Sequence, residues 1–400
     1  MCDVEGSVER HSHGRLVIPS LVLSRLNMTP PRNVVGFLLI EIGVTFGYSV
    51  GVMGQIRTSA SVMALIFALL MGILSVRYRH KILLLIGLVF YSVSAIGCFL
   101  APNYVSMLLA YSLSGIGLAM VSPMSFALVG ELLPLERRSS ATGWIFAGSA
   151  LSSLIGIQVI GYIAGISSWR LVFLGFVFPI ALISLIVAYI GIPSEPVGSA
   201  SSVGEGYYLE GFREVFSNRS AIACLIGTAL SLASYQVVLT YGISFYRQTY
   251  SISPSWAAVL FSGLALCYIV GSLLSGRLVN RFGRKSLTVV GYLLLGLLTV
   301  FFTVVPVLWL SLVFLFLCLV FVGVGDSAAN SLTLEQVPRF RGTMMSTYSA
   351  ATSLGAALGA GLGGALLLRY DYRVMGMVLG GFGIVSAMVY FFLATDPTRK

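Results

Sequence analysis

Two carboxylates stand inside long apolar stretches of this chain, Glu41 and Asp326. A charged side chain in a hydrocarbon layer costs roughly 3 kcal/mol on insertion scales, and such residues are by default functional candidates. Burial favours the uncharged form of a carboxyl group, so either side chain could take up and release a proton. The alternatives are a neutral Glu41 that packs against a neighbouring helix and an Asp326 tied to a backbone donor or a nearby hydroxyl.

Polar and aromatic side chains accompany both carboxylates. Two follow Glu41 at i+4 and i+7, and one follows Asp326 at i+4, which places each set on one helix face. A third apolar run holds an aromatic beside an amide, a pair suited to stacking on and hydrogen-bonding an organic solute. We expect these side chains to line a substrate cavity, with packing against other helices as the alternative. They are Thr45, Tyr48, Asn330, Tyr235 and Gln236.

The composition places the chain in a membrane. Hydrophobic residues make up 57% of the 400 residues and charged residues only 10%, whereas soluble proteins carry about 25%. The apolar residues fall in long runs, each able to cross a hydrocarbon core of ~30 Å, which takes ~20 helical residues. A membrane β-barrel would instead show alternating segments of about 10 residues. The sequence therefore predicts an all-α membrane protein.

Twelve apolar runs predict twelve transmembrane helices in two pseudo-symmetric six-helix bundles. The predicted domains are a cytoplasmic tail (1–32), an N-terminal bundle (33–192), a cytoplasmic linker (193–219), a C-terminal bundle (220–395) and a C-terminal tail (396–400). The predicted helices of the first bundle are Val34–Gln55, Ser59–Val76, Ile82–Ala101, Tyr104–Gly130, Ala141–Gly165 and Leu171–Ile192. Those of the second are Ala221–Tyr246, Trp256–Leu278, Ser286–Val305, Leu308–Leu334, Met344–Leu368 and Val374–Ala394.

The basic residues orient these helices. With both termini on one side, nineteen Lys and Arg fall on that side and five on the other. Positive residues concentrate on the cytoplasmic side of membrane proteins, so both termini are predicted to be cytoplasmic. The net charge of +10 thus has a membrane explanation. The five on the opposite side are Arg57, Arg170, Arg247, Arg369 and Arg373.

The N-terminal tail contains one short apolar stretch, Leu16–Leu26, which Pro19 and Arg25 interrupt. It is too short to span a membrane and lacks the small-residue cleavage site of a secretory signal. We expect this stretch to be disordered, with a segment lying at the membrane interface as the alternative.

The two halves repeat at an offset of 203 to 204 residues. Such a duplication of six helices is typical of secondary transporters, whose substrate site lies between the halves near the bilayer midplane. The matching landmarks are Gly72–Lys81 with Gly276–Lys285, Glu131–Pro134 with Glu335–Pro338, Gly156 and Gly161 with Gly359 and Gly364, and Trp169-Arg170 with Tyr372-Arg373.

The first of these landmarks resembles the G-x-L-x-D-R-x-G-R-K signature of the major facilitator superfamily. The resemblance covers roughly residues 33–395, and the run Pro134–Arg138 and the Trp169-Arg170 pair are also similar to that family. The signature's acidic residue, which in the family helps to latch the cytoplasmic side, is Val76 in one copy and Asn280 in the other. The residues that fit the signature are Gly72, Leu74, Arg77 and Lys81 in the first copy and Gly276, Leu278, Arg281, Gly283, Arg284 and Lys285 in the second.

The resemblance implies that helices one, four, seven and ten surround a central cavity, which Glu41 and Asp326 would face from opposite halves. Drug–proton antiporters of the family also carry an arginine in helix four and a Gly-Pro pair in helix five. Tyr111 and Gly156-Ile157 stand at those places here. Their absence lowers the case for multidrug efflux.

Charged residues at the cytoplasmic helix ends predict a gate. Glu131 and Glu335 end helices four and ten, and pairing with Arg77 and Arg281 would hold the inward side shut. The alternative is a set of plain solvated helix ends. The predicted gate residues are Gly72, Arg77, Lys81, Glu131, Arg138, Gly276, Arg281, Gly283, Arg284, Glu335 and Arg341.

Several classes are disfavoured. The sequence has no GxxxxGK[ST] loop, no CxxC pair and no histidine inside an apolar run, which argues against an ATP-driven pump, a metal site and a haem enzyme. We predict no cofactor, no metal and no enzymatic activity. The expected protein is a monomeric, multi-pass transporter of the cell membrane that moves a small organic solute by alternating access, coupled to protons, without nucleic acid. Multidrug efflux by proton antiport, a facilitative uniporter, a non-transporting sensor and a lipid scramblase are the alternatives.

Overall fold

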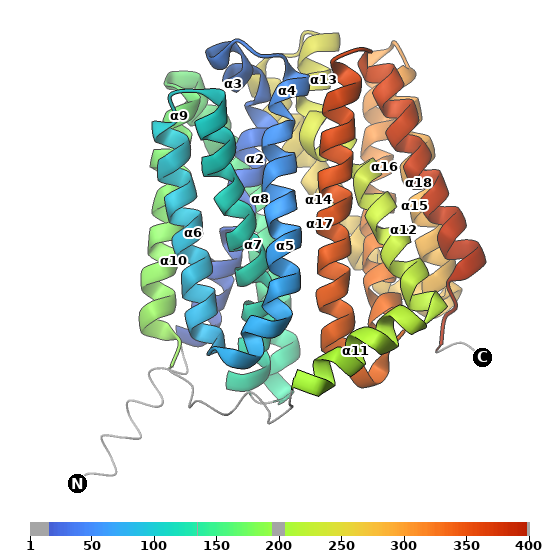
Figure 1. The fold of residues 1–400 in the computed structure, drawn as a ribbon. Helices are drawn as coiled ribbons and strands as arrows, with labels where there is room; N and C mark the ends of the chain where they lie inside the picture. Colours follow the sequence, from blue (N-terminus) through green and yellow to red (C-terminus); the bar gives the residue numbers. More distant parts are fainter. Residues whose placement is uncertain (1–15, 134, 194–204, 398–400) are drawn as a thin grey trace. The chain divides into compact units, whose positions relative to one another are not determined.

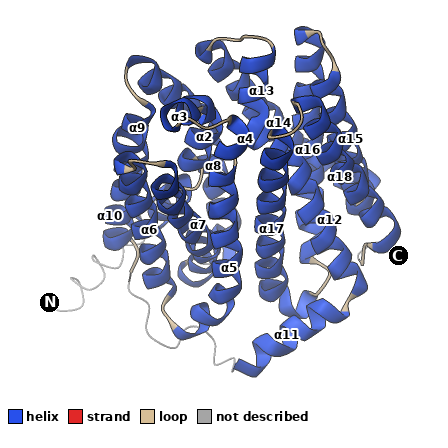
Figure 2. Ribbon diagram, turned by 45° about the horizontal axis from the view of Figure 1, so that its top comes forward, coloured by secondary structure: helices blue, strands red, loops and turns tan. Residues whose placement is uncertain are grey.

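The protein is described by a computed structural model over residues 16–133, 135–193 and 205–397 (Figure 1). Within these ranges every regular element is a helix, and Figure 2 shows the helices joined by short loops. The predicted all-α fold is confirmed for the described residues.

Ten helical stretches in the described residues are long and apolar enough to cross a membrane, at 21 to 31 residues each. The predicted first and fifth helices are not among them. Residues 16–46 form an interrupted helix, and the apolar helix found within α8 (Leu135–Ile166) covers only Leu151–Ile166. The twelve-helix count stays a prediction.

The first helix begins and ends earlier than predicted. Residues 16–26 are helical, and α2 (Pro30–Phe37) and α3 (Leu39–Phe46) follow them in the chain. The chain then turns at Gly47, whose φ of 74° lies in the left-handed region that glycine adopts without strain. The predicted helix Val34–Gln55 therefore contains a turn, which the sequence hides because apolar residues continue on both sides of it.

Residues 16–26 are packed, which corrects the expectation of disorder for this stretch. Leu21 and Ser24 are fully buried. The Ser184 hydroxyl of α10 (Phe178–Gly191) donates to the Leu23 carbonyl at 3.0 Å. This packing ties the stretch to a membrane helix of the same half. Residues 1–15 of the predicted tail lie outside the described residues.

The remaining helices of the first half follow the predicted order. The second membrane helix is α4 (Val50–Met53) followed by α5 (Gln55–Arg77). Asn103 starts the fourth through a capping box, accepting a hydrogen bond from Ser106 N at 2.9 Å. The other elements are α6 (His80–Leu100), α7 (Tyr104–Leu132), α8, α9 (Trp169–Val172), the π-helix η1 (Phe173–Val177) and α10.

The second half repeats this arrangement. Its seventh membrane helix is built from α12 (Arg219–Gln236), the π-helix η2 (Val237–Tyr241) and α13 (Gly242–Thr249). The others are α14 (Pro254–Phe282), α15 (Arg284–Val304), α16 (Leu308–Leu334), the short η3 (Pro338–Phe340), α17 (Arg341–Leu367) and α18 (Tyr372–Leu393).

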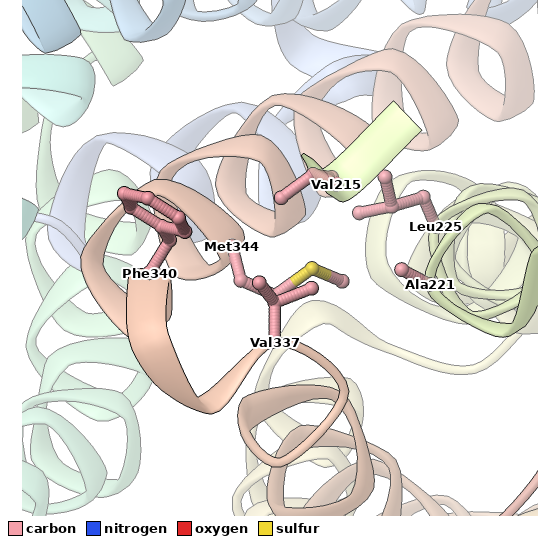
Figure 3. Packing of buried hydrophobic residues seen from close by; sticks show 6 residues of the cluster. All are labelled: Val215, Ala221, Leu225, Val337, Phe340 and Met344. Carbon is pink, nitrogen blue, oxygen red and sulfur yellow. The ribbon is translucent and has the colours of Figure 1, made fainter. Parts of the chain in front are cut away.

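The predicted linker contains a helix of its own, α11 (Glu205–Ser217). Its Val215 is fully buried against residues of α12, η3 and α17 (Figure 3). The linker is therefore docked at its C-terminal end, whereas residues 194–204 lie outside the described part. The buried cluster consists of Val215, Ala221, Leu225, Val337, Phe340 and Met344.

The chain divides into two compact units by contact, Met1–Val34 with Leu70–Val203, and Val35–Leu69 with Gly204–Lys400. Residues 35–69, where the first helix ends and the second begins, thus pack with the helices of the second half. A Cβ added at Gly51 would lie 2.7 Å from the Gly364 carbonyl oxygen, so the backbones of α4 and α17 touch. The predicted bundles follow the repeat rather than these contacts, and their boundaries stay predictions.

Candidate functional site

Asp326 lies in α16 and is held by two tyrosine hydroxyls. Tyr292 of α15 donates to Oδ1 at 3.1 Å, and Tyr268 of α14 donates to Oδ2 at 3.3 Å. Tyr292 is fully buried, whereas Asp326 and Tyr268 are half-buried and keep some accessible surface. The carboxylate of Asp326 is therefore satisfied by neutral donors. Of the two alternatives, a nearby hydroxyl is the partner that the structure shows.

Glycines on α16 and α15 bring these hydroxyls within reach. A Cβ added at Gly291 would lie 2.6 Å from Gly325 Cα, so the backbones of α15 and α16 are in contact next to Asp326. Gly323 similarly packs against the backbone of α14 at Tyr268. The run Gly323-Val-Gly-Asp326 thus places a carboxylate where the backbones of two neighbouring helices are close to that of α16.

Aromatic rings extend this site. Tyr235 of α12 lies parallel to Tyr268, with ring centroids 6.5 Å apart and an interplanar angle of 9°. Tyr348 of α17 lies within electrostatic range of Asp326. Asn330, predicted on the same face, is exposed one turn further along α16. The structure therefore gathers Asp326 with four tyrosines from four helices, of which the sequence indicated only Tyr235.

Gln236 is buried, and its Oε1 accepts a hydrogen bond from Thr240 Oγ1 at 2.7 Å within the same helix. Its place in a substrate cavity stays a prediction. The adjacent π-helix η2 also directs the Tyr241 hydroxyl to the Ala360 carbonyl of α17 at 2.5 Å.

Glu41 lies near the C-terminal end of its helix. The helix starts at residue 16 and ends at Phe46, so Glu41 is five residues, or about 8 Å, from its end. Its Oε1 forms an ion pair with Arg247 Nη2 of α13 at 2.6 Å. Glu41 is thus a paired carboxylate close to the turn at Gly47.

Of the two side chains expected on the helix face of Glu41, Thr45 lies one turn further along α3 and Tyr48 lies beyond its end. Thr45 Oγ1 donates to the Glu41 backbone carbonyl at 2.9 Å. Tyr48 follows the end of α3 and is 49% exposed. The predicted i+7 position of Tyr48 fails because the helix has ended at Gly47.

Arg57 contributes a contact that the sequence did not indicate. It is buried in α5, with 8% of its surface exposed, and its Nη1 donates to the Leu239 carbonyl at 2.6 Å. Leu239 belongs to the π-helix η2, whose wider turn releases a backbone carbonyl from the regular ladder. The sequence places Arg57 in the loop between the predicted helices Val34–Gln55 and Ser59–Val76, because the positive-inside rule considers only residues at helix ends.

The predicted gate pairs are replaced by others in the first half. Glu131 Oε1 lies 2.6 Å from His80 Nδ1 rather than beside Arg77. Lys81 Nζ donates to the carbonyls of Tyr189 and Ile192 at 2.9 and 2.5 Å, at the C-terminal end of α10, where a cation is favoured. The side-chain surroundings of two further gate residues, Gly72 and Arg138, lie outside what the structure describes.

The second half also differs from the predicted gate. Glu335 Oε2 pairs with Arg341 Nη2 at 2.8 Å, whereas Arg281 lies over the Phe282 ring. Gly283, with φ of 86°, makes the turn into Arg284 and α15. Gly276 has no atom within 4 Å of an added Cβ, so packing does not require glycine there.

Two arginines assigned to the cytoplasmic tail lie inside the first helix. Arg25 belongs to helix 16–26 and Arg32 to α2. The repeat contains the signal that would have located them, because residues 16–46 correspond to Arg219–Thr249 at the offset of 203. Hydropathy missed this helix since the arginines themselves interrupt its apolar run.

Metal ligands are not gathered in the described residues, where no group of three or more His, Cys, Asp or Glu side chains could hold a metal ion.

Comparison with known proteins identifies the family. The family model of the Major Facilitator Superfamily matches residues 23–264 and 224–400. The chain belongs to this superfamily. Its members named below are transporters, and a transporter rather than an enzyme is thereby confirmed.

Two relatives from Bacillus subtilis (strain 168) are named as uncharacterized transporters of this superfamily. YceJ is 28% identical over 312 residues, covering 75% of this chain and 76% of its own. YwfA is 23% identical over 368 residues, covering 90% and 87%. These relatives support the family and name no substrate.

Solved structures confirm the fold. A D-xylose–proton symporter superposes with a TM-score of 0.79 at 17% identity, over 96% of this chain and 99% of its own. A bacterial homologue of the lysosomal transporter Spinster, in an inward-facing occupied state, reaches 0.77 at 17% identity, over 94% and 96%. The nucleoside transporter NupG reaches 0.75 at 15% identity, over 94% and 98%. At these identities the likeness concerns fold alone.

Proposed function

We propose that this protein is a secondary transporter that moves a small organic solute together with or against protons, and that Asp326 carries the proton. The observation that supports this role is the partner set of Asp326. The other described carboxylates of the membrane helices, Glu41, Glu131 and Glu335, each have a basic partner, whereas Asp326 has two tyrosine hydroxyls. When a carboxylate without a basic partner takes up a proton, it leaves no buried cation without its counter-charge.

The tyrosines suit both protonation states. A carboxylate accepts from both hydroxyls, whereas a protonated carboxyl donates one hydrogen bond, and a phenol can accept as well as donate. Proton uptake at Asp326 therefore rearranges hydrogen bonds between α16 and its neighbours α14 and α15. We propose that this rearrangement couples the proton to the alternation of access, by which two helical bundles expose a central site to each side in turn.

Glu41 receives a different role in this proposal. Its ion pair with Arg247 joins the end of the first helix to the end of the seventh. We propose that this ion pair holds residues 35–69 against the helices of the second half. The ion pair would break when residues 35–69 move away from those helices. Asp326 then acts as the coupling group, and Glu41 as part of a clamp.

The test is proton flux in proteoliposomes with an internal pH dye, challenged with pools of sugars, organic acids, amino acids and cationic drugs. We expect one pool to change the internal pH in the wild type, and Asp326→Asn to abolish this change while keeping solute exchange. The matched control is Asp371→Asn. Asp371 caps α18, and asparagine caps equally well, so flux should persist. Solute uptake with no pH change in the wild type would establish a uniporter and refute the coupling role.

A further inference from the structure

The first helix carries two arginines within its length, Arg25 and Arg32. Arg32 comes sixteen residues after the start of the helical path at residue 16 and fourteen before its end at Phe46, close to the middle. Arg25 precedes it across a break at residues 27–29. Interrupted helices near the bilayer midplane form substrate sites in secondary transporters. Near the middle of a membrane-spanning helix an ionised side chain such as that of Arg32 is costly. Such residues are by default candidates for a functional role.

Acidic residues are scarce in the described part of the unit that holds these arginines. Residues 16–34 and 70–193 contain only two, Glu131 and Glu136, and both lie where α7 gives way to α8. Glu131 is paired with His80. Arg25 and Arg32 lie close enough to repel each other electrostatically. Two cations are thus held near one another, and no ion pair with a carboxylate is found for either among the described residues.

Neutral groups satisfy Arg25 only in part, and Arg32 is exposed. Arg25 Nη1 donates to the Ser122 hydroxyl of α7, and its guanidinium lies 4.9 Å from the centre of the Phe126 ring. Its Nε is buried without an acceptor among the described residues. The side-chain nitrogen of Asn33, next to Arg32, is likewise buried without an acceptor there. The unfilled positions are all donors.

Hydrogen-bond donors without acceptors and positive charge without a counter-charge indicate which kind of ligand would fit beside these residues. Guanidinium groups bind carboxylate and phosphate through charge-assisted, often bidentate hydrogen bonds. An oxyanion would supply acceptors to Arg25, Arg32 and Asn33 together and would relieve the repulsion between the arginines. A neutral sugar would leave that repulsion in place, and a cation would increase it.

The repeat places this cationic cluster opposite in sign to the Asp326 site. Residues 16–46 and Arg219–Thr249 align at an offset of 203, which places Arg32 opposite Tyr235. Glu131 and Glu335 align at an offset of 204, which places Ser122 opposite Asp326. Both clusters thus involve the central helix pairs one with four and seven with ten at equivalent positions. The first half offers cations where the second half offers a carboxylate.

We propose that Arg25, Arg32 and Asn33 bind an oxyanion of the transported solute, so that the substrate is an organic anion bearing a carboxylate or a phosphate. This assignment rests on the proposed transport function, because it takes the bound group to be the cargo. Solute and proton then bind on different halves, at the arginines and at Asp326.

The test is ligand binding to purified full-length protein in detergent, measured by thermal shift and then by calorimetry. The anionic probes are benzoate, succinate, citrate, glucose 6-phosphate and inorganic phosphate, with the carboxylates and phosphates as separate arms. Xylose and choline serve as neutral and cationic probes. We expect one anionic class to raise the melting temperature of the wild type, and Arg32→Gln to weaken its binding at least about tenfold, the value of one charged hydrogen bond.

Matched variants keep the outcome interpretable. Arg32→Lys retains the charge and should bind more weakly than the wild type yet better than Arg32→Gln, which separates binding from folding. Arg373→Gln removes an exposed arginine at the start of α18 and should change nothing. Asp326→Asn should still bind the anion while losing proton flux. Tight binding of xylose or choline that survives Arg32→Gln, or stabilisation by none of the anions, would overturn the anion site. Proton-coupled flux of a neutral or cationic solute would do the same while leaving the transporter proposal intact.

Discussion

Removal of the Glu41 charge should loosen residues 35–69 from the helices of the second half. Glu41 Oε1 and Arg247 Nη2 are 2.6 Å apart, and the two side chains are 31% and 12% exposed. The remaining Glu41 Oε2 and Arg247 Nη1 are buried without hydrogen-bond partners among the described residues. In Glu41→Gln the Arg247 charge would therefore stay largely buried and uncompensated wherever these segments are in contact.

The size of the effect follows from this burial. Removing one partner of a fully buried ion pair costs about 3–5 kcal/mol, whereas a surface pair is worth about 0–1 kcal/mol. The partial exposure of Glu41 places this pair between the two, at about 2 kcal/mol. Since each 1.4 kcal/mol is a factor of ten, the population with residues 35–69 released should rise by about 30-fold.

Cysteine labelling measures this population. Thr58 lies on α5 against Gly361 of α17, where a Cβ added at Gly361 would be 3.4 Å from the Thr58 methyl carbon. With the native cysteines replaced, Thr58→Cys should react slowly with a maleimide in detergent and faster by up to about 30-fold when Glu41→Gln is added. Pro102→Cys, in the exposed loop before α7, should react at one rate in both backgrounds.

Exchange of the two charges provides the decisive control. The double variant Glu41→Arg with Arg247→Glu restores an ion pair and should return Thr58→Cys to slow labelling, whereas either change alone should not. Equal labelling rates in the wild type, Glu41→Gln and Arg247→Gln would refute the clamp. Loss of proton coupling in Glu41→Gln at an unchanged labelling rate would instead return Glu41 to the coupling role.

Three further changes test the packing and hydrogen bonds. Arg57→Gln removes a charged donor from the Leu239 carbonyl and should destabilise the protein by about 1.5–3 kcal/mol; an unchanged melting temperature in detergent would contradict this. Gly383→Ala brings a Cβ to 2.7 Å from Gly296 Cα and should destabilise by about 1–3 kcal/mol. Gly381→Ala, two residues away with open space around it, should not lower the melting temperature. Asn103→Ala loses the capping box of α7 and should cost about 1 kcal/mol, whereas Asn103→Asp should be tolerated, as chemical denaturation would show.

Much of the architecture was predictable because it depends on local composition. Long apolar runs, the cap at Asn103 and the glycine at 283 are local signals, and the helices they predict lie within a few residues of their places. Asp326 was found for the same reason, as a lone carboxylate in such a run. Its tyrosine partners were not, since Tyr268 and Tyr292 are 58 and 34 residues away in sequence and only packing selects them.

Failures of the prediction occur where one local signal opposes another. Gly47 ends a helix within a continuous apolar run, so hydropathy carried Val34–Gln55 through the turn. Arg247, the partner of Glu41, is 206 residues away from it, a distance over which periodicity carries no information. Arg57 was read as a loop residue by a charge rule that has no place for a buried arginine bound to a carbonyl.

The first helix shows why such failures point toward function. Its apolar pattern is broken by Arg25 and Arg32, and the structure leaves the buried Nε of Arg25 and the side-chain nitrogen of Asn33 without acceptors among the described residues. Selection for stability alone would favour an apolar residue in place of Arg32. The apolar run would then be continuous, and hydropathy would predict the helix. Local inconsistency is expected to concentrate at functional sites, where stability is given up. The repeat predicts this helix, because the two halves keep their helices at equivalent positions even where the side chains differ. Arg32 in the first half and Tyr235 in the second are such a pair. Comparing the two copies position by position therefore separates what the fold requires from what the substrate requires.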